Sequence, residues 1–139
     1  MKYTYQKDGY KPTTEIFVFG SNLSGIHGAG AAKEARYRYG AIWGRGDGIM
    51  GRSYAIPTKD RSIVTLPLLK IKPWIDEFIK FATDNPTMKF YVSRIGCGYA
   101  GWDDYDIAPF FRSAPTNCSF AENWKEYLEP TWIDMERPQ

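Results

Sequence analysis

The sequence predicts a single α/β domain in which helices pack on a mixed or parallel central sheet. Strand-like and helix-like segments alternate along the chain, and two glycine-rich loops each stand between a strand and a helix. The 139 residues are enough for one hydrophobic core that needs neither disulfides nor a metal. Residues 1–139 are therefore expected to form one domain.

The first half of the chain supplies a strand, a helix and a second strand. Residues 15–20 read as a strand that is apolar on both faces, so it should lie in the centre of the sheet. Residues 29–39 should form a helix that begins with small residues and stops at Gly40. Residues 53–58 should form a short strand, which Pro57 either ends or places at a sheet edge.

The second half continues the alternation. A helix is predicted at residues 72–83, with Pro73 in its first turn. Its apolar positions fall on one face: Ile71, Ile75, Phe78, Ile79 and Ala82. Residues 88–95 should form a strand, and residues 103–113 a helix that Pro109 distorts.

The last part of the chain should return to this core. A final strand is expected at residues 117–120. The C-terminal segment should pack back as a short helix through four large apolar side chains: Trp124, Tyr127, Leu128 and Trp132.

Composition narrows the function classes. With 43% hydrophobic residues and a net charge of +2, the chain lacks the clustered basic excess of duplex nucleic-acid binders. It has no apolar run of about eighteen residues, and its N-terminus lacks the apolar core of a signal peptide, so a cytoplasmic protein without membrane contact is expected. Cys97 and Cys118 are interpreted as free thiols, and no metal-ligand spacing is present. The sequence leaves the oligomeric state open.

Glycines gather in two loops. Nine of the 13 lie between Gly20 and Gly51, and three more between Gly96 and Gly101. We call residues 20–32 the first glycine loop and residues 95–101 the second. Because ligands in α/β sheets bind beyond the carboxyl ends of the strands, the two loops should face each other. Backbone N–H groups in such loops and at helix N-termini bind phosphates, which predicts a diphosphate ligand.

A third glycine string, GRGDGIMG at residues 44–51, imitates the dinucleotide-binding fingerprint. It follows a helix and not a strand, so it is interpreted as a mobile connection.

The strings GSNLSGIHGAGAAK and SRIGCGYAG resemble the two ligand loops of macrodomains, the ADP-ribose-binding family. They are most similar to the terminal ADP-ribose protein glycohydrolase branch, and the compact chain fits a stand-alone bacterial or phage member. The resemblance covers residues 15–112 in element order. It implies a three-layer α/β/α sandwich with a mixed central sheet, ADP-ribose as a small-molecule partner, and no cofactor.

The resemblance also implies roles for single residues. Asn22 falls where macrodomains contact the distal ribose, and an acidic residue ahead of the first strand usually holds adenine, for which Asp8 is a poor candidate. Tyr99 and Trp102 are candidates for stacking or for closing over the distal ribose, with loop anchoring as the alternative. The remaining ligand-binding candidates are loop positions whose backbone groups could contact the ligand: Gly20, Ser21, Gly28, Ala29, Gly30, Ala31, Ile95, Gly96, Cys97, Gly98 and Ala100.

Only half of the implied catalytic pair is present. Lys59, in the string IPTK, matches the lysine that attacks the ribose anomeric carbon in the glycohydrolase branch, which requires a lowered pKa. The partner aspartate is replaced by Ala100, and the aspartate of the other hydrolase branch by Ala32. Asp103 or Asp104, three or four residues further on, is the candidate to replace that aspartate as the catalytic acid, and a helix N-cap with its dipole partner is the simpler role of the pair.

Three residues have both a catalytic and a structural interpretation. His27, the only histidine, is either a general acid or a residue that fixes its loop by a hydrogen bond. Lys59 is either a nucleophile or a solvated charge at a strand end. Cys97 is more simply a small packing residue than a nucleophile, because no base is visible near it.

The sequence therefore supports two classes of function. The first is a binding module that recognises ADP-ribose or a related nucleotide diphosphate. The alternative is an ADP-ribosyl hydrolase or ADP-ribose phosphate phosphatase that uses Lys59, His27 or both. Single-stranded nucleic-acid binding by Tyr3, Tyr5, Tyr10 and Trp43 is a third class, but it needs a basic groove that the sequence does not show.

Overall fold

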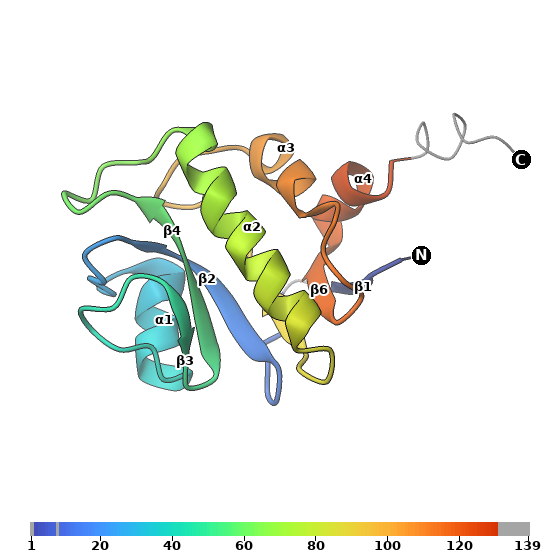
Figure 1. The fold of residues 1–139 in the computed structure, drawn as a ribbon, viewed down its shortest axis with the longest axis horizontal. Helices are drawn as coiled ribbons and strands as arrows, with labels where there is room; N and C mark the ends of the chain where they lie inside the picture. The colour runs from blue at the N-terminus through green and yellow to red at the C-terminus, as the bar shows by residue number, and fades with distance from the viewer. Residues whose placement is uncertain (1, 8, 131–139) are drawn as a thin grey trace, which may run out of the picture.

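Helices cover both faces of a six-stranded sheet in the computed structural model, which describes residues 2–7 and 9–130 (Figure 1). The strand order is β1-β6-β5-β2-β4-β3, with β1 (Thr4–Gln6), β2 (Ile16–Asn22), β3 (Gly48–Met50), β4 (Ser53–Lys59), β5 (Phe90–Val92) and β6 (Cys118–Ala121). The helices are α1 (Gly30–Arg38), α2 (Leu68–Asp84), α3 (Asp104–Ile107) and α4 (Lys125–Leu128), with 3-10 turns η1 (Ala108–Phe111) and η2 (Glu122–Trp124). Asp8 and Trp132 lie outside the described residues.

The sheet is mixed, as predicted. Its neighbouring strands are parallel except for β3, which runs antiparallel to β4. β2 lies between β4 and β5, so the apolar strand predicted for the centre does lie there.

Alternate residues of the central strands point into two separate cores, which makes the fold a three-layer sandwich. Phe17 and Phe19 of β2 pack under α1. Val18, between them, packs on the other side with Ile75 and Phe78 of α2. The alternation follows from the period of two in a strand, and it explains why β2 is apolar on both faces.

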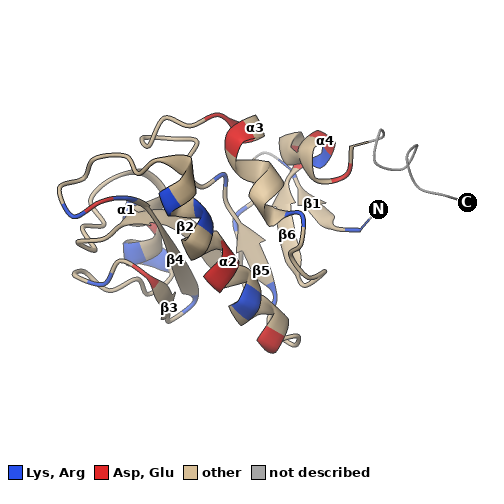
Figure 2. Cartoon of the chain, turned by 45° about the horizontal axis from the view of Figure 1, so that its top comes forward, with Lys and Arg blue, Asp and Glu red and all other residues tan. Residues whose placement is uncertain are grey.

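The predicted helix at residues 72–83 begins four residues earlier, at Leu68, so Pro73 lies inside α2 and not in its first turn. Proline inside a helix leaves the carbonyl four residues back without its donor. Here that carbonyl belongs to Leu69, which is exposed, so water can replace the missing bond. The outer face of α2 carries the ion pairs Lys72–Asp76 (2.7 Å) and Lys80–Asp84 (2.8 Å) (Figure 2).

Pro57 does not end its strand, because β4 continues to Lys59. The edge strand β3 pairs with β4 only as far as Ala55, so beyond that point β4 has a neighbouring strand only on the side of β2. A residue without an N–H is tolerated on such an unpaired side.

Two short strands were not predicted. β1 adds to the edge next to β6, and β3 forms within the string at residues 44–51, so part of the segment interpreted as a connection is an edge strand of the sheet. The predicted strand at residues 88–95 is shorter, only Phe90–Val92.

The C-terminal predictions are confirmed where the structure describes them. The strand predicted at residues 117–120 is β6. The helix predicted at residues 103–113 is shorter and changes from α3 to the 3-10 turn η1 at Ala108, next to Pro109. Trp124 is fully buried and Leu128 nearly so, which packs η2 and α4 onto the core. None of the described helices has the length and apolar character needed to cross a lipid bilayer.

Candidate functional site

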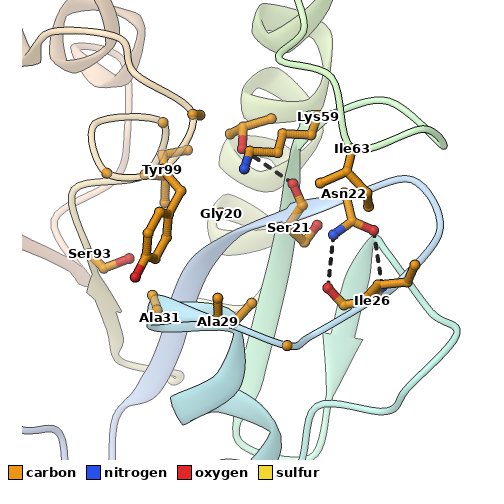
Figure 3. A pocket seen from close by; sticks show the side chains of 18 of the residues that line it. Gly20, Ser21, Asn22, Ile26, Ala29, Ala31, Lys59, Ile63, Ser93 and Tyr99 are labelled. Carbon is orange, nitrogen blue, oxygen red and sulfur yellow. Dashed lines mark hydrogen bonds between the residues drawn. The ribbon is translucent and has the colours of Figure 1, made fainter.

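A cleft of about 780 Å³ opens at the carboxyl ends of β2, β4 and β5 (Figure 3). It lies where an open α/β sheet is expected to bind ligands. The residues that line it come from both glycine loops, from the end of β4 and the turn after it, and from the two residues between β5 and the second loop: Gly20, Ser21, Asn22, Ile26, Gly28, Ala29, Gly30, Ala31, Ala32, Thr58, Lys59, Ile63, Ser93, Arg94, Ile95, Gly96, Gly98, Tyr99 and Ala100.

The two glycine loops face each other across this cleft, as their positions in the sequence predict. Tyr99, which is 77% exposed, reaches from the second loop to the start of α1. A Cβ atom added to Gly30 would lie 2.9 Å from Cε2 of the Tyr99 ring, and Gly30 itself has φ +57°. The backbone conformation thus favours glycine at position 30, and a larger residue there would also have to displace the exposed Tyr99 ring.

Backbone donors are the main polar groups of the two loops. Ala29 stands at the N-cap of α1 without a side-chain cap, which leaves the N–H groups of the first turn open. Within the described part of the chain, no acceptor bonds the N–H groups of Gly96, Gly98, Tyr99 or Ala100. Open N–H groups of two loops and a helix N-terminus form a surface suited to an anion.

Asn22 lines the cleft, and its amide forms hydrogen bonds within the first glycine loop. Its Nδ2 donates to the carbonyl of Ile26 (2.9 Å), and its Oδ1 accepts from the N–H of Ile26 (3.0 Å). Ser21, beside it, donates from its hydroxyl to the carbonyl of Gly46. Both side chains therefore shape the first glycine loop, and the ribose contact that the resemblance implies for Asn22 stays a prediction.

His27 does not face the cleft. It is fully buried, and its Nε2 lies 3.0 Å from the carbonyl oxygen of Ile42 and 2.8 Å from that of Arg45. Since both neighbours are acceptors, Nε2 carries a proton and donates. His27 thus fixes its loop to residues 42–45, the structural alternative that the sequence left open, and its position gives no support to a catalytic role.

Residues 42–46 act as a support for the first glycine loop, which sequence reasoning missed. The N–H of Gly44 donates to the carbonyl of Gly25 (2.9 Å). A Cβ atom on Gly46 would lie 2.1 Å from the carbonyl oxygen of Asn22, so only glycine allows the two segments to approach so closely. The repeated glycines at residues 44–51 were the available signal.

Lys59 lies at the end of β4 and lines the cleft. Its Nζ is 5.9 Å from the centroid of the Tyr99 ring. Among the described residues, no carboxylate forms an ion pair with it. The structure therefore brings Lys59 to the same cleft as the two glycine loops.

The two acids nearest to the second glycine loop have structural partners and do not line the cleft. Asp103 caps α3 in a reciprocal arrangement with Asp106, as the simpler interpretation predicted. Asp104 accepts hydrogen bonds from Nε (2.8 Å) and Nη2 (2.6 Å) of Arg94 and from Nε1 of Trp124 (2.6 Å). Burial alone would raise the pKa of the Asp104 carboxyl, but the bonds from Arg94 and Trp124 hold it below its ordinary value.

Cys97 and Trp102 belong to the second glycine loop and its border but do not line the cleft. Burial, and then the charge of Asp104, raises the pKa of the Cys97 thiol to about 12, so it stays protonated. Trp102 donates from Nε1 to the carbonyl of Leu66 (3.1 Å) and from its backbone to Gly96 (2.8 Å). Trp102 is therefore a loop anchor, which was its alternative interpretation.

Five residues that line the cleft were not singled out from the sequence: Ile26, Thr58, Ile63, Ser93 and Arg94. Thr58 directly precedes Lys59, and Arg94 directly precedes Ile95, so the motifs that pointed to these neighbours could also have indicated Thr58 and Arg94. Ile63 gave no signal, because its place depends on the turn that follows β4.

The aromatic residues considered for single-stranded nucleic acid do not form one exposed platform. Tyr3 is buried in the core and donates from its hydroxyl to the carbonyl of Ala114 (2.7 Å). Tyr5 is half-buried and bonds to Glu129, whereas Tyr10 and Trp43 are exposed. Within residues 2–7 and 9–130, no cluster of His, Cys, Asp or Glu side chains is arranged to hold a metal ion.

Comparison with known proteins identifies the fold. The sequence matches no family model and no curated protein. The structure is similar to the macrodomain of Mycobacterium tuberculosis DarG, with a TM-score of 0.64 and 18% identity over 86% of this chain and 96% of that one. It is also similar to Thermosipho africanus DarTG, solved in complex with ADP-ribose, with a TM-score of 0.59 and 13% identity over 87% of this chain and 43% of that one. The chain thus has the macrodomain fold, and it spans less than half of the second protein.

Proposed function

We propose that the cleft binds ADP-ribose or a related nucleotide diphosphate through the two glycine loops. The observation that carries the proposal is the set of open backbone N–H groups on both sides of one cleft, at the start of α1 and in the second loop. A diphosphate has acceptor oxygens on both of its phosphates, so it can bond to both loops at once. The solved complex of a protein with the same fold and ADP-ribose supports this choice of ligand.

The charges of the cleft agree with an anionic ligand. Lys59 and Arg94 are the ionised side chains that line it, and none of its described lining residues is acidic. Arg94 is also paired with the carboxylate of Asp104, whereas Lys59 forms no ion pair with a described carboxylate, so Lys59 is the cation available to attract a phosphate ligand and to stabilise it once bound. Binding should therefore weaken as the salt concentration rises.

A hydrolase that uses Lys59 is the second candidate, because Lys59 lines the cleft and has no ion-pair partner among the described residues. This is the activity that the similarity of residues 94–98 to the terminal ADP-ribose protein glycohydrolases implies. The cleft contains no carboxylate to act as general acid and base, since Ala32 and Ala100 occupy the two aspartate positions. Binding without turnover is therefore favoured.

Isothermal titration with ADP-ribose, ADP, NAD and ribose 5-phosphate tests the proposal. We expect saturable binding that is strongest for ligands with a diphosphate, and binding to none of the four would refute it.

Lys59→Ala then separates the two candidates, with Lys89→Ala as a matched exposed lysine at the start of β5. If the protein only binds, Lys59→Ala should lower the affinity a few-fold and Lys89→Ala should leave it unchanged. Neither variant should release product from ADP-ribosylated substrates. Turnover by the wild type that disappears in Lys59→Ala alone would establish the hydrolase instead.

A further inference from the structure

The turn after β4 holds a branched residue in an unfavourable conformation. Ile63 has φ +64°, and among the described residues it is the one non-glycine residue with a positive φ. For a β-branched side chain this conformation is a genuine outlier. Such outliers persist where the surrounding structure fixes them, and they cluster at binding sites.

The turn itself explains how Ile63 is held. The Oδ1 atom of Asp60 accepts from the N–H groups of Ser62 (2.8 Å) and Val64 (3.0 Å). The N–H of Asp60 donates to the carbonyl of Val64 (2.8 Å), and the N–H of Ile63 donates to the carbonyl of Asp60 (3.1 Å). These bonds impose the left-handed conformation at position 63, where glycine or asparagine would be accommodated without strain.

The strain places an apolar side chain in the cleft. Ile63 lines the cleft and is 40% exposed, and Ile26 lines it as well and is 41% exposed. Figure 3 shows the two side chains on either side of the Asn22 amide, across the cleft from Tyr99. Asn22 donates one N–H to Ile26 and accepts one from it, and the side chains of Ile26 and Ile63 supply aliphatic contact on this side of the cleft.

We propose that Ile26 and Ile63 form an apolar clamp for a flat heteroaromatic ring carried by the nucleotide ligand. The proposal rests on the proposed function, since the diphosphate bound by the glycine loops would bring the ring to this side. Ring faces are apolar, so they gain from contact with two aliphatic side chains that are otherwise in water. The ring is either the adenine base or a ring on the second sugar, as nicotinamide is in NAD.

The test compares Ile63→Gly with Val64→Gly. Val64 is the next residue of the same turn, is 58% exposed and does not line the cleft. Thermal unfolding and titration with ADP-ribose, NAD and ribose 5-phosphate are measured for both variants and for Ile26→Ala.

Ile63→Gly should raise the midpoint of unfolding by roughly 2–4 °C, because the strain is removed. It should also weaken binding of the ring-bearing ligand about five- to tenfold, because an apolar contact is lost. Val64→Gly should unfold at or below the wild-type temperature with unchanged affinity, and Ile26→Ala should reproduce the loss of affinity.

The ligands show which ring is held. A loss with ADP-ribose and NAD alike but not with ribose 5-phosphate identifies adenine, and a loss with NAD alone identifies the ring on the second sugar. Unchanged affinity of Ile63→Gly for both ligands would overturn the clamp and leave the proposed function intact. Failure of the wild type to bind either ligand would instead overturn the proposed function, and the clamp with it.

Discussion

Gly98 and Gly30 both line the cleft, but a valine at each should affect folding differently. A Cβ atom on Gly98 would meet no atom within 4 Å, and its φ is not positive. Gly98→Val should therefore change the free energy of unfolding by no more than about 0.5 kcal/mol. Gly30 has φ +57°, so Gly30→Val should lower the free energy of unfolding by about 1–2 kcal/mol.

Ligand binding should be lost in both variants. In Gly98→Val the new side chain stands where a phosphate would accept from the open N–H groups of the second glycine loop. A hydrogen bond to a charged group contributes about 1.5–3 kcal/mol, so losing two costs about 3–6 kcal/mol. That free energy corresponds to a loss of affinity of about 10²- to 10⁴-fold.

The assay is titration with ADP-ribose together with thermal unfolding. Thr87→Val serves as the control, because Thr87 is exposed in the turn between α2 and β5. The informative variant is Gly98→Val, since it separates binding from stability. If it folds as the wild type does and binds ADP-ribose with unchanged affinity, the second glycine loop does not hold the phosphates and the reasoning is wrong.

Two further predictions concern buried groups. Asp104→Asn should lower the free energy of unfolding by about 2 kcal/mol in chemical denaturation at pH 7, because Arg94 and Trp124 lose a charged acceptor. Since folding lowers the pKa of Asp104, this contribution is complete above about pH 4 and disappears as the pH falls through the folded-state pKa, so the difference between variant and wild type should shrink there. Burial raises the pKa values of the Cys97 and Cys118 thiols to about 12. A thiol reagent at pH 8 should therefore label neither cysteine in the native protein and both after unfolding. Rapid labelling of Cys97 in the native protein would contradict its assignment as a packing residue.

The sequence predicted the strands and helices that have a clear hydrophobic pattern of their own. The segment that forms β2 is apolar on both faces, which is a strong signal for a central strand. The segment that forms α1 begins with small residues and is followed by Gly40, which is a strong signal for a helix. β1 and β3 are three residues each, too short for a periodic signal, and they form because a neighbouring strand offers bonds. The start of α2 was misplaced because Pro73 is a typical first-turn residue, whereas solvent at Leu69 permits it inside the helix.

For the candidate site, the sequence predicted where the backbone of the two glycine loops lies. Glycine spacing after a strand was enough to place both loops at one cleft. The roles of side chains were harder to predict, because they depend on partners distant in the chain. Asn22 and His27 look like ligand contacts in the sequence, but each is bonded within the first glycine loop or its support. The strain at Ile63 arises from bonds to Asp60, which no composition or period reveals.

The glycohydrolase branch that residues 94–98 resemble has an aspartate where this chain has Ala100, which is the strongest reason to favour binding over hydrolysis, provided that no nearby acid replaces it. Asp103 is held in the cap of α3. If Asp104 turned toward the cleft, it would leave the buried Nε1 of Trp124 without an acceptor, which costs about 1–3 kcal/mol, and would also break both bonds to Arg94. The two acids that follow Ala100 in the chain thus have partners of their own, and the groups left to act on a ligand are backbone donors, Lys59, the paired Arg94 and apolar contacts.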